Sequence, residues 1–310
     1  MSTQSNAVPD TPLESRAEAP ALMRATQPLY WSVRREFWEN RAIYVAPLVV
    51  AGLLLLGFLL NLARLTQRLR VTLQQSELQQ HQFIEQPYHF AVLLIMGTTF
   101  LVAIFYCLDA LYGERRDRSI LFWKSLPVSD VATVLSKASI PLVVLPLVTF
   151  AITVVAQGII LVVSTVAFTA SGLSVAPIWN HRSLFHMWLG LLYHLVAIHG
   201  LWYAPFYGWL LMVSAWAKRS PFLWAFLPPF AIAVIEKIAF NTSYFTKMLA
   251  YRFMGGPGGA TSAPGSMSMD ALTPFTLGQF LTSPGLWLGL GVTAAFLAVA
   301  VRLRRYREPI

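Results

Sequence analysis

The sequence contains little charge for its length. Only 12% of its 310 residues are Asp, Glu, Lys or Arg, whereas 56% are hydrophobic. Soluble domains carry about 25% charged residues, so this composition excludes an ordinary soluble protein and predicts an integral membrane protein. Lys and Arg outnumber Asp and Glu by 23 to 14, but no basic patch interleaved with aromatic residues lies on a soluble stretch. We therefore expect a lipid membrane as a partner and no nucleic acid.

Cysteine is nearly absent. Because Cys107 is the one cysteine, the chain cannot form an intramolecular disulfide. Cys107 lies within an apolar run, where we expect it to act as a small buried hydrophobic residue. The phosphate-binding pattern G-x-x-x-x-G-K-[ST] is missing as well, which leaves the chain without a recognisable ATPase of its own. We expect no catalytic residue, no metal site and no cofactor bound by this chain.

The sequence also lacks the apolar core of a signal peptide at its start. Residues 1–28 are polar and contain four prolines, a composition that predicts a disordered tail. A membrane domain is expected to follow over residues 29–308.

Long uncharged apolar runs dominate the rest of the chain. A run of about 20 apolar residues is long enough to cross the hydrocarbon core as a helix. The fifth run is short and contains Pro228 and Pro229, so we expect it to be broken or tilted. The pattern predicts an all-α, polytopic membrane protein with six transmembrane helices, at residues 43–62, 90–108, 138–170, 187–216, 222–235 and 285–301.

The distribution of Lys and Arg predicts the orientation. Six spans place both termini on one side, and that side collects 16 of the 23 Lys and Arg residues. Because positive residues favour the cytoplasmic side, both termini are predicted to be cytoplasmic. Arg64, Arg68 and Arg70 run against this rule in the first external loop.

Residues 29–41 read LYWSVRREFWENR and have a helical period. One face is expected to carry Tyr30, Val33, Phe37 and Trp38. The other face is expected to carry Ser32, Arg35, Glu36 and Glu39. The segment is either an amphipathic helix at the membrane interface or simply the flank of the first span.

Residues 109–137 form the densest block of charge between two apolar runs. Charged residues are mixed there with Ile120, Leu121, Phe122 and Trp123. The mixture predicts a short amphipathic helix at the membrane surface that is available to a partner. An ordinary solvated loop between two spans is the alternative.

The same block carries a recognisable order of residues: Glu114-Arg115, then Ser119-Ile120-Leu121, then Ser125 to Ser129, then Lys137. This order resembles the cytoplasmic signature of type-2, export-type permeases of ATP-binding cassette (ABC) transporters. The resemblance covers roughly residues 30–307. It implies that the block is a coupling helix docking on an ATPase through Glu114, Arg115, Arg116, Ser119, Leu121, Phe122, Trp123, Leu126 and Pro127.

The resemblance also implies partners and a location. A permease of this kind works with two copies of an ABC ATPase subunit, which bind ATP and Mg, and with a second permease subunit in a homodimer or heterodimer. It is an exporter in the bacterial cytoplasmic (inner) membrane. In such permeases an N-terminal connector helix contacts the ATPase, here with Tyr30, Val33, Arg34, Phe37 and Trp38.

Histidines in the fourth span suggest a different class of function. An intramembrane enzyme would use His186, His194 and His199. However, His194 and His199 are five residues apart, about 140° around a helix, and no carboxylate lies near them in sequence. Hydrogen bonding between helices is favoured over a metal site or proton relay. A membrane anchor or sensor that recruits an ATPase is a third alternative.

Overall fold

The computed structural model describes residues 26–72, 77–120, 128–172, 184–253 and 277–306. Every regular element in these ranges is a helix, which confirms the all-α prediction. Five helices are long and apolar enough to cross a membrane, and a sixth crossing results if one bent pair of helices is counted as a single span. The chain is therefore a multi-pass membrane protein.

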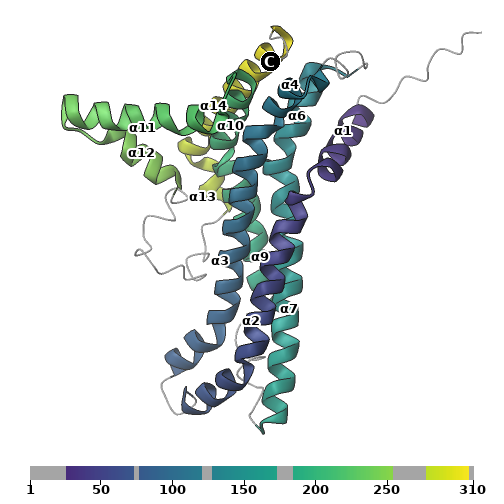
Figure 1. Cartoon of the computed structure of the whole chain (residues 1–310). Coiled ribbons are helices and arrows are strands. Elements are labelled where there is room, and N and C mark those ends of the chain that lie inside the picture. The colour runs from purple at the N-terminus through teal and green to yellow at the C-terminus, as the bar shows by residue number, and fades with distance from the viewer. Residues whose placement is uncertain (1–25, 73–76, 121–127, 173–183, 254–276, 307–310) are drawn as a thin grey trace, which may run out of the picture.

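The first half is built on long antiparallel helices (Figure 1). Helix α1, Thr26–Glu39, leads into α2, Ala42–Thr72, and the chain returns as α3, Glu77–Ala110. A short helix, α4, Tyr112–Arg116, continues the end of α3. Helix α2 runs ten residues beyond the first predicted span, so the first helix extends past its apolar part.

A second long rod follows residues 121–127. It consists of α6, Asp130–Ser139, a π-helical segment η1, Ile140–Val144, and α7, Leu145–Ala170. The Ser129 side chain accepts a hydrogen bond of 3.1 Å from the backbone N–H of Ala132 and so caps the start of α6. Pro141 and Pro146 lie at the starts of η1 and α7. Because proline lacks an N–H, the regular α-helical ladder is interrupted at this point without ending the rod.

The fourth predicted span is bent. Helix α9, Leu184–His194, passes into a second π-helical segment, η2, Leu195–Trp202, and the chain then turns by 46° at Tyr203 into α10, Ala204–Trp216. The predicted span at residues 187–216 is therefore helical but does not form one straight helix.

Helix α11, Pro221–Phe240, is continuous through Pro228 and Pro229, so of the two predicted alternatives, broken or tilted, the helix is not broken. Figure 1 shows α11 running across the axis of α2 and α3, with α12, Tyr244–Phe253, returning beneath it. Pro229 cannot donate to the carbonyl of Ala225, four residues earlier. That carbonyl instead accepts a hydrogen bond of 3.0 Å from Trp209 Nε1 of α10, and this replaces the lost helical bond.

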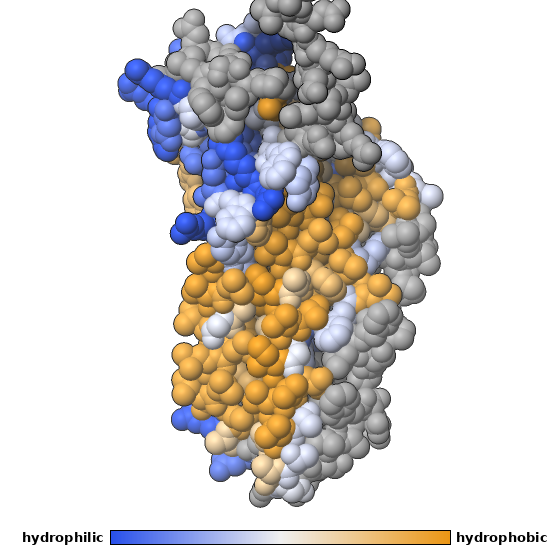
Figure 2. Space-filling model, turned by 90° about the vertical axis from the view of Figure 1, so that its right-hand side faces the viewer, coloured by the Kyte–Doolittle hydropathy of each residue, from blue (hydrophilic) through white to orange (hydrophobic). Residues whose placement is uncertain are grey.

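The chain closes with α13, Leu277–Thr282, and α14, Pro284–Tyr306. Helix α14 packs along α10, where a Cβ added at Gly208 would lie 3.3 Å from Thr293 Cγ2. Small residues at such contacts let membrane helices approach closely. One face of the molecule carries a broad apolar band between two hydrophilic ends, as expected for a surface in contact with lipid (Figure 2).

Candidate functional site: a buried charge network

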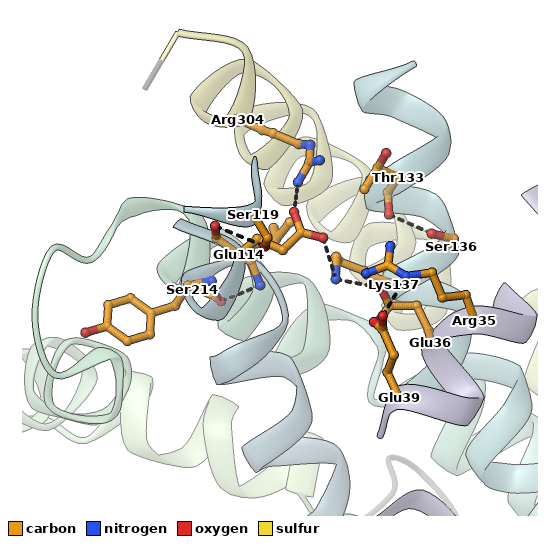
Figure 3. A network of polar contacts seen from close by, with 12 residues as sticks. Arg35, Glu36, Glu39, Glu114, Ser119, Thr133, Ser136, Lys137, Ser214 and Arg304 are labelled. Atoms are coloured by element: carbon orange, nitrogen blue, oxygen red, sulfur yellow. Dashed lines mark hydrogen bonds and ion pairs between the residues drawn. The ribbon is translucent and has the colours of Figure 1, made fainter. Parts of the chain in front are cut away.

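Charged side chains from four helices meet inside one end of the bundle (Figure 3). We call them the charge network: Glu36 of α1, Glu114 of α4, Asp130 and Lys137 of α6, and Arg304 of α14. All except Asp130 are less than 10% exposed. The network therefore joins elements that are up to 268 residues apart in sequence, the separation of positions 36 and 304.

Lys137 and Glu114 are the centre of the network. Lys137 Nζ lies 2.7 Å from Glu36 Oε1 and 3.0 Å from Glu114 Oε1. The other oxygen of Glu114 pairs with Arg304 Nη1, and Arg304 Nε lies 3.1 Å from Asp130 Oδ1. Each of the two cations of the network thus has two carboxylates, an arrangement that offsets the cost of removing the charges from water.

Glu36 is held by three groups. Besides the ion pair with Lys137, its Oε2 accepts a hydrogen bond of 2.9 Å from the hydroxyl of Tyr106 on α3. Asn40 Nδ2 donates to the same Oε2 at 3.4 Å and to the Glu36 carbonyl at 3.0 Å. The carboxylate of α1 is therefore fixed against both α3 and α6.

A second set of contacts joins the α3–α4 corner to the end of α10. The Ser214 hydroxyl accepts hydrogen bonds from the backbone N–H groups of Leu111, at 3.0 Å, and Tyr112, at 2.9 Å. Arg115 Nη1 donates to the carbonyls of Ala215 and Ala217, the second at 3.2 Å. These carbonyls lie at a helix C-terminus, where helical partners are missing and a cation is favoured.

The predicted coupling residues fall into four groups. Glu114 and Arg115 are buried and bonded within the chain, and their contact with an ATPase stays a prediction. Arg116 is exposed and donates to Asp117 at 2.9 Å, and this hydrogen bond lowers the pKa of the Asp117 carboxyl. Ser119 is partly buried, with its hydroxyl 3.4 Å from the Glu114 carbonyl. Five residues lie outside the described part of the chain: Leu121, Phe122, Trp123, Leu126 and Pro127.

Helix α1 packs only part of its predicted apolar face against the bundle. Val33 and Phe37 pack against the core, whereas Tyr30 and Trp38 are 60% and 65% exposed. Glu36, assigned by period to the polar face, is buried. Residue 36 lies about 60° around the helix from Val33, at the edge of the apolar face, and its burial is made favourable by Lys137 and Tyr106, which are distant in sequence. Arg34 is exposed, and its guanidinium lies 5.2 Å from the centre of the Trp31 ring.

Sequence reasoning named Glu36, Glu114 and Lys137 but missed the other two residues of the network, Asp130 and Arg304. It also did not single out Tyr106, which donates to Glu36. The available signal was position, because Lys137 and Arg304 are cations at the edges of long apolar runs. Position alone, however, does not identify which carboxylate each cation meets.

The histidines of the fourth span form no metal site in the part of the chain that the structure describes. Within those residues, no group of three or more His, Cys, Asp or Glu side chains is arranged to hold a metal ion. His194 and His199 lie within the bundle on consecutive elements, and the side chain of His186 lies outside the described part.

No protein-family model, curated protein or solved structure matches this chain. Its function must therefore be inferred from its own residues and contacts.

Proposed function

We propose that this protein is the membrane-spanning permease subunit of an ABC transporter, and that it is an exporter driven by a separate ATPase. One observation carries the proposal. Glu114 and Lys137, two residues of the motif that resembles type-2 permeases, form a buried ion pair of 3.0 Å. The same Lys137 pairs with Glu36 on the helix that resembles the connector. Two segments that would both face an ATPase are thus linked through one lysine.

In this proposal the charge network transmits movement from the membrane surface to the spans. Residues 117–129 connect α4 to α6, and a partner acting on them pulls on both helices. Lys137 transfers the movement to α1 through Glu36, and Glu114 transfers it to α14 through Arg304. Paired buried charges suit this task because separating any pair is costly, so the connected helix ends move together.

The proposal includes six spans, with α9, η2 and α10 counted as one bent crossing. The charge network then lies at the cytoplasmic end, as do both termini, in a bacterial inner membrane. Exposed side chains near it are suited to meeting an ATPase: Tyr30, Trp31, Arg34 and Trp38 of α1, with Arg116 and Asp117 after α3.

The partners in this proposal are two ABC ATPase subunits and a second permease subunit, the same or a homologue. ATP and Mg are bound by the ATPase subunits and not by this chain. Unlike a lone enzyme, the chain would then show no activity without its partners.

Two substitutions in the predicted coupling segment, a charge reversal and the removal of an aromatic side chain, test the proposal. We expect Arg116→Glu and Trp123→Ala to lower transport-coupled ATP hydrolysis of the reconstituted complex while leaving membrane insertion intact. Lys247→Glu on α12 is a matched control, because Lys247 is exposed and lies on the hairpin away from the network. Wild-type coupling in both test variants would contradict the proposed docking segment.

A further inference from the structure

A stripe of polar side chains runs along the buried face of α7. Thr149, Thr153 and Gln157 recur every four residues, and each is at most 1% exposed. This spacing places them one above another on one side of the helix. Thr149 Oγ1 lies 2.8 Å from Thr99 Oγ1 of α3. The stripe faces the interior of the bundle and not the lipid.

Two histidines come to the same region from α9 and η2. Trp188 Nε1 of α9 donates a hydrogen bond of 3.0 Å to Gln157 Oε1 and so sets the register between α9 and α7. The two helices run in opposite directions (Figure 1). At about 1.5 Å per residue, Thr153 and His194 are displaced from this bond in the same direction, by about 6 Å and 9 Å. His199 follows, its ring 5.8 Å from that of Phe100, the residue after Thr99.

Several polar atoms in this region are buried and have no hydrogen-bond partner among the residues that the structure describes. We call the residues that carry them the polar column. The atoms are Thr153 Oγ1, Gln157 Nε2, His194 Nδ1, His199 Nδ1 and His199 Nε2. More than about 90% of buried polar groups in proteins are hydrogen-bonded to protein or to ordered water. These five unpaired polar atoms lie on three elements that follow one another in the chain, α7, α9 and η2. Their concentration in one interior therefore indicates a ligand.

Both π-helical segments of the chain's described part, η1 and η2, lie beside or within the polar column. His199 lies within η2, and η1 directly precedes α7. The two segments touch at Gly200, where an added Cβ would lie 2.8 Å from the Leu142 carbonyl oxygen. Single-turn π-helical segments occur frequently at functional sites, because they turn side chains and carbonyls away from their regular positions.

We propose that the polar column is a binding site for a short chain of water molecules inside the membrane-spanning bundle. Its side chains are neutral hydrogen-bonding groups, and imidazole, hydroxyl and amide each match a ligand that both donates and accepts. Water has this chemistry, and two to four polar partners are enough to hold one molecule. The inference is independent of the proposed transport function, because it rests only on contacts within this chain.

Hydroxyl-radical footprinting of the purified protein in lipid nanodiscs tests the inference. Radicals generated by X-rays from bound water label the side chains beside that water. We expect His199 to be oxidised faster, relative to its intrinsic reactivity, than Trp202, which is fully buried and already donates its N–H to the Arg252 carbonyl. A rate for His199 at or below that of Trp202 would overturn the proposal.

A substitution then links the labelling to the column. Thr153→Val replaces the hydroxyl with a methyl group of similar size and is expected to reduce His199 labelling towards the level of Trp202. Thr98→Val is the matched control, because its hydroxyl already donates to the Leu94 carbonyl of its own helix. Unchanged His199 labelling in Thr153→Val, or an equal loss in Thr98→Val, would count against the site.

Discussion

Glu114 is the residue on which the charge network depends most. One of its oxygens meets Lys137 and the other meets Arg304, so a single carboxylate balances two buried cations. Replacing such a group leaves its partners charged, buried and only partly compensated. The cost of removing one partner of a buried ion pair is about 3–5 kcal/mol, far more than the loss of an exposed pair.

We therefore predict that Glu114→Gln lowers the free energy of unfolding by about 3–5 kcal/mol. Unfolding by SDS in mixed micelles measures the change. Glu39→Gln is the control, since Glu39 pairs with Arg35 at 2.7 Å on the exposed side of α1, and its loss should cost about 0.5 kcal/mol or less. Equal losses of unfolding free energy in the two variants would show that the buried ion pairs of Glu114 stabilise the protein no more than an exposed pair does.

Lys137 and Glu36 allow the coupling between α1 and α6 to be measured directly. We predict that Lys137→Met and Glu36→Gln are each destabilising, and that the double variant loses less than the sum of the two. The reason is that each single change leaves the other charge buried near fewer partners. Additive losses in the mixed-micelle titration would mean that the 2.7 Å contact does not couple the two helices.

At the scale of the elements, the contact between η1 and η2 requires a glycine. An added Cβ at Gly200 would lie 2.8 Å from a backbone carbonyl oxygen that cannot rotate away. We predict that Gly200→Ala destabilises the protein by about 1–3 kcal/mol, as overpacking does elsewhere. Gly97→Ala is the control, because nothing lies within 4 Å of its Cβ position, and alanine there should stabilise α3 by about 0.5–1 kcal/mol. The midpoint of thermal unfolding should fall in Gly200→Ala and rise in Gly97→Ala. An unchanged midpoint in Gly200→Ala would contradict the prediction.

Trp209 supplies the donor that α11 loses at Pro229. We predict that Trp209→Phe leaves the Ala225 carbonyl without its 3.0 Å donor and costs about 1–3 kcal/mol. Hydrogen exchange should become faster in the first half of α11, around Ala225, and stay unchanged in α7. Unchanged exchange in α11 would mean that the hydrogen bond does not support the helix.

The positions of the helices could be predicted from the sequence, whereas the side-chain contacts between helices could not. Apolar length identified α2, α3, α7 and α14, because a membrane span must be long and uncharged. Apolar length also located α11 but left open whether its two prolines break or only tilt it, since the donor that replaces a missing proline N–H comes from another helix. Sequence reasoning failed for Glu36, because helical period sorts a carboxylate to the polar face unless a distant Lys137 is known to be there.

At the scale of the whole molecule, charge and apolar surface are separated along the bundle. The charge network closes one end, whereas an apolar band covers the exposed face of the middle (Figures 2 and 3). This separation fits a protein that is anchored in lipid and acted on from one side. In our proposal the acting partner is an ATPase, and the network connects it to α1, α6 and α14.

The central claim is that this chain is a permease with a separate ATPase partner. The most direct measurement is purification of the tagged protein in mild detergent, with identification of whatever co-purifies and an assay of ATP hydrolysis. The account predicts a stoichiometric nucleotide-binding subunit that hydrolyses ATP and is lost when residues 121–123 are replaced by polar residues. A single polypeptide that purifies without any nucleotide-binding partner would contradict it.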